Sequence, residues 1–314
     1  MSDSNPHSMK ETDDGTPNSR VIRLARLEHG DGAIVGFIDG DEVVEITMSW
    51  HEALAALADG RGLDVRRAAG GRRITWTEAA LMMPLLPGSE VHCVGLNYRA
   101  HAAEASELVD APRADPIIFA KSYRSMTRPA ATLSLPQAVS GEFDWEVELG
   151  VVIGKDAINI APDEAWSYVA GYCVVNDITA RDIQKLHQQW HLGKNIPAST
   201  PIGPWVVGRE GFPVPPDLEV VLRINGKIKQ HAFTSQLIHD VPALVSLLSR
   251  TTSLRVGDII ATGTPQGVGF ARQPPEFLRD GDFVETEVIG VGRLTNVIDD
   301  RVHPAAAPRP VSVS

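Results

Sequence analysis

The sequence predicts a mainly β protein of the α+β class, in which a rolled or sandwiched sheet carries peripheral helices. Three observations predict it. Short runs rich in Val, Ile and Leu outnumber the helical stretches, Gly- and Asp-containing turns separate them, and the strand–helix alternation of a doubly wound parallel sheet is missing. The chain has 314 residues, 43% of them hydrophobic and 22% charged, which is enough for one sizeable core and a smaller appendage.

The N-terminal part of the chain is predicted to be a small β-rich unit. Residues 21–46 form short alternating runs separated by the turns HGDG and DGD, and residues 51–60 are typical of a helix that ends at Gly60. Pro84 and Pro87 punctuate the chain before the next apolar run. We therefore expect a disordered tail over 1–20, a small domain over 21–85, a main domain over 86–300 and a flexible tail over 301–314.

The main domain is predicted to consist mostly of strands. Three stretches have helical character: residues 97–109 are rich in Ala and Glu, residues 161–169 begin with a proline and two acids, and residues 241–251 have apolar residues at helical spacing. The predicted strands occupy residues 90–96, 115–121, 146–154, 170–177, 203–208, 218–226, 257–263 and 282–298.

Composition excludes several classes of function. The formal net charge of -11 and the absence of clustered Lys and Arg argue against nucleic acid and anionic membranes as partners. Cys93 and Cys173 both lie in apolar sequence, and neither belongs to a CxxC motif, so both are expected in the core. The N-terminal residues contain no apolar signal segment and no apolar run reaches 18 residues, so we expect a cytoplasmic protein.

A cluster of acids carries the first chemical signal. Asp144, Glu146 and Glu148 occupy alternate positions, so a β-strand would project them from one face, and Asp177 follows another apolar strand. Three carboxylates with no His or Cys companion suit Mg²⁺ or Mn²⁺. A solvated edge strand is the alternative for the isolated ExE motif. Glu146, Glu148 and Asp177 are the predicted metal ligands, and Asp144 is expected to be structural or at the rim rather than a fourth ligand.

Several motifs follow one another over most of residues 91–270. They are VGLNYRAHAAE, PIIFAKS, DWEVELGVVIGK, GYCVVNDITARDIQ, GKNIPASTPIGP and LRVGDIIATGTPQGVG. In this order they resemble the fumarylacetoacetate hydrolase family, whose members include acylpyruvate hydrolases and 2-hydroxyhepta-2,4-diene-1,7-dioate isomerases. The resemblance implies that family's mixed β-roll or sandwich fold, with residues 86–300 as the catalytic domain. It also implies a homodimer.

The resemblance also implies roles for further residues. His101 and Glu104 match a dyad that activates water, with His101 as general base and Glu104 orienting it. Their segment resembles a lid, so we expect that His101 can lie far from the metal when no substrate is bound. Lys121 and Lys194 are implied to face the substrate and to stabilise negative charge on it.

The remaining implied site residues lie further along the chain. Arg181 and Gln184 match residues near the substrate, although an ion pair of Arg181 near Asp182 is an equally good interpretation. Thr264 matches a threonine that holds the substrate carboxylate. Trp190 and His191 are expected to shape the variable end of the pocket.

The glycines around Thr264 also resemble a nucleotide-binding loop. We reject a dinucleotide site because a phosphate-binding glycine loop opens a helix, whereas residues 270–282 read FARQPPEFLRDGD.

The expected activity is metal-dependent hydrolysis of a carbon–carbon bond in a 2,4-dioxo acid such as an acylpyruvate or fumarylpyruvate. The products would be a carboxylic acid and a 2-oxo acid, in the catabolism of aromatic or sugar-derived compounds. Decarboxylation of a β-oxo acid and isomerisation of a 2-hydroxy-diene dioate are the alternatives within the family. A non-catalytic binding protein is the remote alternative, although every ligand and dyad position holds the residue type that catalysis requires.

Overall fold

The computed structural model describes residues 21–30, 32–104 and 115–301. The predicted N-terminal tail over 1–20 lies outside these residues, as does the predicted C-terminal tail except Arg301. The second part of the helix predicted over 97–109 also falls outside them.

Strands from between residues 23 and 261 form one large sheet. Its strands follow the order β4-β3-β2-β1-β13-β11-β10-β16-β5-β6, and β7 pairs with β13. Neighbours are antiparallel except for two parallel pairs, β16 with β5 and β13 with β7. The strands are β1 (Arg23–His29), β2 (Gly32–Asp39), β3 (Glu42–Ile46), β4 (Ala69–Thr75), β5 (Val91–Gly95), β6 (Ile117–Lys121), β7 (Met126–Thr127), β10 (Val147–Ile153), β11 (Val169–Asn176), β13 (Thr200–Gly208) and β16 (Ile259–Ala261).

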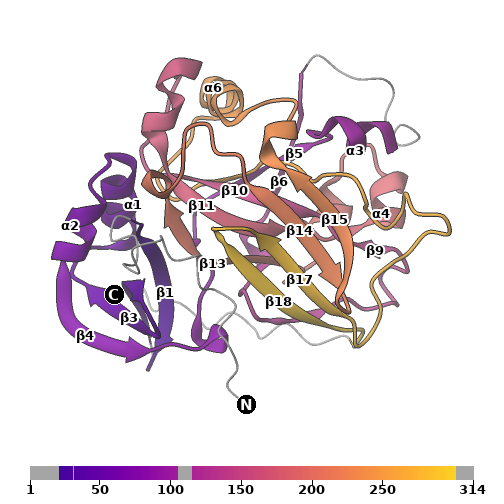
Figure 1. The fold of residues 1–314 in the computed structure, drawn as a ribbon. Helices are drawn as coiled ribbons and strands as arrows, with labels where there is room; N and C mark the ends of the chain where they lie inside the picture. Colours follow the sequence, from indigo (N-terminus) through magenta and orange to yellow (C-terminus); the bar gives the residue numbers. More distant parts are fainter. Residues whose placement is uncertain (1–20, 31, 105–114, 302–314) are drawn as a thin grey trace.

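A second sheet packs against the first, and a short strand pair lies beside them. The second sheet has the order β15-β14-β17-β18-β8, and β12 pairs with β9. In Figure 1, β14, β15, β17 and β18 form the orange-to-yellow layer in front of β10 and β11. These strands are β8 (Thr132–Ser134), β9 (Phe143–Asp144), β12 (Thr179–Ala180), β14 (Glu219–Ile224), β15 (Lys227–Phe233), β17 (Phe283–Val288) and β18 (Gly292–Asp299).

Helices lie at the periphery of the sheets. The α-helices are α1 (Trp50–Ala58), α2 (Gly62–Arg67), α3 (Arg99–Glu104), α4 (Arg181–Leu186), α5 (His191–Lys194) and α6 (Val241–Thr251). The 3₁₀ helices are η1 (Glu78–Ala80), η2 (Tyr123–Ser125), η3 (Pro162–Tyr168), η4 (Arg209–Gly211) and η5 (Thr234–Gln236). Ser49 and Glu52 form a capping box at the start of α1, and Asp240 caps α6. None of these helices is long and apolar enough to cross a membrane.

Strands β10 and β11 are buried on both faces. On one face, residues such as Leu149 and Val174 pack with the second sheet; on the other, Val152 and Val175 join a core that includes α1. Double-sided burial explains why both strands are nearly continuous apolar runs. The strand-rich α+β architecture with peripheral helices matches the predicted fold class.

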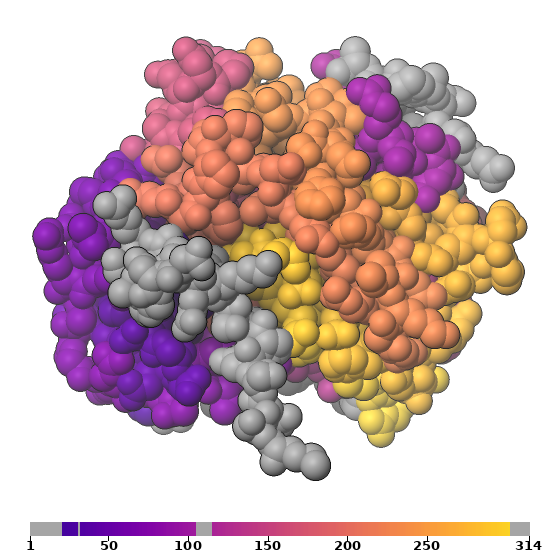
Figure 2. Space-filling model, viewed as in Figure 1, coloured from indigo at the N-terminus to yellow at the C-terminus, as the bar shows by residue number. Residues whose placement is uncertain are grey.

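The N-terminal strands continue the large sheet. Strand β1 pairs with β13, with Arg23 opposite Val207 and Leu24 opposite Val206. Figure 2 shows the indigo N-terminal residues on one side of the molecule and the orange and yellow strands across the centre of the same face. The sheet therefore crosses the proposed boundary near residue 85, and the division into two domains stays a prediction.

Candidate metal and catalytic site

Antiparallel pairing of β10 with β11 brings three predicted metal ligands together. Glu148 lies on β10, Glu146 directly precedes that strand, and Asp177 directly follows β11. The Asp177 backbone N–H donates to the Glu146 carbonyl at 2.9 Å. All three side chains are buried, and one carboxylate oxygen from each lies within 4.8 Å of the others. The predicted cluster is therefore present, and three clustered oxygen donors can bind a divalent metal.

Asp144 stands apart from the three-carboxylate cluster. The regular strand is interrupted between Asp144, which belongs to β9, and Val147, where β10 begins. The prediction that one continuous strand projects Asp144, Glu146 and Glu148 together was therefore wrong for Asp144. Its carboxylate instead accepts from the backbone N–H groups of Trp145 and Gly269, at 2.8 and 2.6 Å, and is outside the acidic cluster.

Two buried lysines contact the cluster. Lys121 Nζ lies 2.5 Å from Asp177 Oδ1, and Lys194 Nζ lies 2.7 Å from both Glu146 Oε2 and Asp177 Oδ2. Burial lowers the pKa of Lys194, but Asp177 and Glu146 raise it by more, so the ammonium form is favoured. Both predicted lysines are therefore at the acidic cluster.

The three carboxylates are not electrostatically equivalent. Burial raises the pKa of Glu146, but Lys194, Arg181 and His101 outweigh it and hold this pKa at about 2. Burial, followed by the negative charges of Asp177 and Glu146, raises the pKa of Glu148 well above its ordinary value. A cation at the cluster would offset this repulsion, so the donor set fits a hard divalent metal.

His101 and Glu104 form the predicted dyad on α3. His101 Nδ1 lies 2.9 Å from Glu104 Oε1, and the buried imidazole lines the same cavity as Glu146 and Glu148. If Nδ1 donates to Glu104, His101 Nε2 is the free basic nitrogen. His101 lies at the site in this structure, and the lid position away from the metal stays a prediction.

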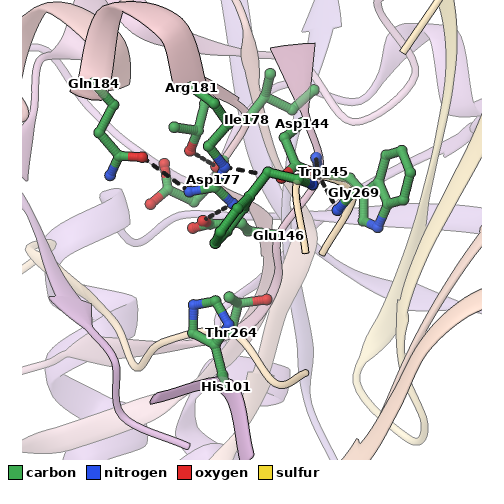
Figure 3. Close-up of polar contacts among 12 residues, drawn as sticks. His101, Asp144, Trp145, Glu146, Asp177, Ile178, Arg181, Gln184, Thr264 and Gly269 are labelled. Carbon is green, nitrogen blue, oxygen red and sulfur yellow. Dashed lines mark hydrogen bonds and ion pairs between the residues drawn. The ribbon is translucent and has the colours of Figure 1, made fainter. Parts of the chain in front are cut away.

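Most of the predicted site residues line one cavity of about 550 Å³. Figure 3 shows His101 and Thr264 on one side, with Glu146, Arg181 and Gln184 across from them. Predicted site residues that line it are His101, Glu146, Glu148, Arg181, Gln184, Lys194 and Thr264. Trp190, which was expected to shape one end, lines it as well, whereas His191 is not among the lining residues.

Arg181 forms ion pairs with two acids, and neither of them is Asp182. Its Nε donates to Asp144 Oδ2 at 2.8 Å, and its Nη2 lies 2.6 Å from Glu146 Oε1. Its Nη1 donates to Gln184 Oε1 at 3.0 Å. Asp182 accepts instead from Ser140. Arg181 therefore has the ion pairs of the alternative interpretation, with Asp144 and Glu146 rather than Asp182, and it also lines the cavity.

Two supporting residues escaped the sequence analysis. Gln230 on β15 donates from Nε2 to Thr264 Oγ1 at 2.8 Å, which fixes that hydroxyl. Asn176 accepts at Oδ1 from the Glu146 backbone N–H at 3.0 Å. Asn176 stands in the ND motif beside Asp177 and was available as a signal, whereas Gln230 carries none because only sheet packing brings it to Thr264.

The comparison with known protein families identifies the family to which this chain belongs. The family described as "Fumarylacetoacetate (FAA) hydrolase C-terminal" matches residues 90–299. The chain belongs to the fumarylacetoacetate hydrolase family. The family segment contains the acidic cluster, the dyad and both lysines, so the resemblance stated from the motifs is confirmed.

Named relatives within the fumarylacetoacetate hydrolase family carry different activities. Oxaloacetate tautomerase YisK of Bacillus subtilis is 40% identical over 223 residues, which cover 71% of this chain and 74% of that protein. The structure of a fumarylacetoacetate hydrolase from Exiguobacterium antarcticum is 32% identical, with a TM-score of 0.76 over 89% of this chain and all of that one. A 2-hydroxyhepta-2,4-diene-1,7-dioate isomerase from Mycobacterium marinum is 34% identical, with a TM-score of 0.71 over 88% of this chain and 98% of its own.

Proposed function

We propose that this protein catalyses keto–enol tautomerisation of a 2-oxo dicarboxylic acid of the oxaloacetate class. The observation that carries the proposal is the hydrogen-bonded His101–Glu104 pair, whose imidazole lines one cavity with Glu146 and Glu148 of the acidic cluster. Tautomerisation needs one proton moved between carbon and oxygen, and a positioned His supported by a carboxylate suits that task. The name of the Bacillus subtilis relative supports this choice over the hydrolysis predicted from the sequence.

The chain's own residues divide the work. His101 Nε2 takes the proton from the carbon beside the keto group, and Glu104 stabilises the imidazolium. The electron pair of that C–H bond forms the carbon–carbon double bond, and the former keto oxygen receives the proton. Arg181 and Lys194 place positive charge beside the substrate's oxygens. A divalent ion held by Glu146, Glu148 and Asp177, which we infer to be Mg²⁺ or Mn²⁺, would supply Lewis-acid polarisation of the keto group.

Hydrolysis of a 2,4-dioxo acid is the second candidate function. The same observation favours it, because His101 could take its proton from water instead of from carbon, and the water would then attack the distal carbonyl. The name of the Exiguobacterium antarcticum relative agrees with this candidate. A cytoplasmic location, a homodimer and a place in the catabolism of aromatic compounds remain predictions.

A substrate panel separates these functions. With Mg²⁺ present, we expect the protein to accelerate the loss of the ultraviolet absorbance of the oxaloacetate enol, and we expect His101→Gln to slow this by about 10²-fold or more. Acetylpyruvate and fumarylpyruvate should be left intact. Formation of pyruvate and a carboxylic acid from either diketo acid, with oxaloacetate tautomerising only at its uncatalysed rate, would establish hydrolysis instead. Release of CO₂ from oxaloacetate would indicate the decarboxylase.

A further inference from the structure

Asp144 is a buried acid beside the site to which the proposed chemistry gives no role. Its side chain is fully buried, and protein donors surround both oxygens. Oδ1 accepts from the backbone N–H groups of Trp145 and Gly269, at 2.8 and 2.6 Å. Oδ2 accepts from Phe270 N at 3.1 Å and from Arg181 Nε at 2.8 Å. Protein donors therefore occupy both oxygens of this carboxylate.

These contacts fix the orientation of Arg181. Asp144 holds its Nε, Gln184 holds its Nη1, and the Phe270 ring centroid lies 4.6 Å from its Cζ. The remaining nitrogen, Nη2, forms an ion pair with Glu146 Oε1 at 2.6 Å. Because a guanidinium Nη carries two N–H groups, this nitrogen, on a side chain that lines the cavity, can also donate to an anionic oxygen of a ligand.

Asp144 also fixes the loop that contacts the dyad. The Gly269 and Phe270 amides bind its carboxylate, and two residues earlier the Gly267 amide donates to Glu104. The approach of Asp144 to this loop is close, because a Cβ on Gly269 would lie 2.7 Å from Asp144 Oδ1 and 2.0 Å from the Glu276 carbonyl. One carboxylate therefore joins the cationic side of the cavity to the loop that holds the dyad.

We propose that Asp144 is a positioning residue that aims Arg181 Nη2 at an anionic oxygen of the substrate and fixes the 267–270 loop beside it. The proposal deepens the proposed function, because it assigns recognition of a substrate carboxylate to a guanidinium set by Asp144. Asp144 itself neither lines the cavity nor belongs to the acidic cluster, so it acts through Arg181 and the loop.

The test measures ligand binding rather than turnover. Oxalate serves as the probe, and its affinity for the Mg²⁺-loaded protein is measured by calorimetry, alongside Mn²⁺ affinity without oxalate. Asp144→Asn removes the negative charge that pairs with Arg181, and either amide orientation sets an N–H₂ group against two of the four N–H donors, so the side chain can no longer hold Arg181 and the loop together. We expect oxalate to bind Asp144→Asn at least tenfold more weakly, with Mn²⁺ affinity changed less than threefold.

A double-mutant cycle with Arg181 separates positioning from a merely structural role. In an Arg181→Lys background, Asp144→Asn should weaken oxalate binding less than threefold, because the guanidinium that Asp144 orients is already gone. Additive losses in the cycle, or a lower melting temperature with unchanged oxalate affinity, would overturn the proposal. If Asp144→Asn does not fold, Asp144→Glu carries the same cycle, because it keeps the charge but moves it. Coupled oxalate binding without any tautomerase activity would refute the proposed function and leave the positioning role intact.

Discussion

Both carboxylate oxygens of Glu104 lie 3.1 Å from the backbone nitrogen of Gly267. This contact ties helix α3 to the 267–270 loop, while Glu104 Oε1 also lies 2.9 Å from His101 Nδ1. Glu104 therefore orients the imidazole with its carboxylate and anchors α3 to the loop. Its removal should affect catalysis more than folding.

Glu104→Ala is expected to lower kcat for oxaloacetate tautomerisation by about 10²- to 10⁴-fold, because the imidazolium loses its orienting charge. Steady-state kinetics with thermal melts as a folding check will measure it. The control is Glu219→Ala, which removes a His–Glu pair of the same length, His231 Nε2 to Glu219 Oε1 at 2.9 Å, from the surface. Loss of activity in the control, or full activity in Glu104→Ala, would contradict a catalytic dyad.

Glu148→Gln is expected to stabilise the metal-free protein and to abolish its response to Mg²⁺. The substitution removes one negative charge beside Asp177 and Glu146, and the amide oxygen can still accept from Gly263 N, which now donates to Glu148 at 2.9 Å. Melting temperatures in EDTA and in MgCl₂ test this prediction, with the parent rising in MgCl₂ and the variant unchanged.

A second acidic cluster provides the matched control for Glu148→Gln. Asp280, Asp299 and Asp300 also bring three carboxylates together, but two of the three are exposed. Asp280→Asn should leave the Mg²⁺ response of the parent intact. If Asp280→Asn abolished the response and Glu148→Gln did not, the metal would belong to the other cluster.

Much of this site was predictable because its residues lie in short motifs on adjacent strands. Glu148 on β10 and Asp177 after β11 needed only antiparallel pairing to meet. The direction of Asp144 was not predictable, since a period-two pattern does not reveal that the regular strand is interrupted before Glu146. The contact of Gln230 with Thr264 depends on where β15 lies relative to a distant loop, which no local pattern encodes.

Lys194→Met is expected to destabilise the metal-free protein by about 3–5 kcal/mol, because it leaves Glu146 and Asp177 buried without one of their cations. Mg²⁺ should recover part of this loss by replacing the missing positive charge. Urea unfolding in EDTA and in MgCl₂ measures both effects. Lys155→Met is the control: its ion pair with Asp59 is partly exposed, and removing it should cost at most about 1 kcal/mol. Equal losses in the two variants would contradict the electrostatic account.

His92 is expected to make the protein less stable in acid. Burial lowers the pKa of His92, and the charges of Asp258 and Glu90 only partly offset this. Its folded-state pKa lies below the unfolded value of about 6.5, so the stability that the neutral ring contributes is present above that pH. It is lost as pH falls through the folded-state pKa.

His92→Gln tests this sign, because glutamine does not bind the proton. The free energy of unfolding in urea should fall less between pH 8 and pH 5 in His92→Gln than in the parent. His51→Gln, at an exposed position on α1, should behave as the parent does. An identical pH dependence in parent and His92→Gln would show that other groups control the acid response.

Gly95→Ala is expected to raise KM by about tenfold through Trp190. A Cβ at position 95 would lie 2.5 Å from Trp190 Cζ3, so the indole must leave its place in the cavity wall, where it packs edge-on against Phe119. Because Trp190 → Phe shortens the ring, adding it to Gly95→Ala should restore part of the lost affinity. Gly141→Ala, where a Cβ meets nothing within 4 Å, should keep the parent KM. A normal KM in Gly95→Ala would mean that Trp190 does not contact the substrate.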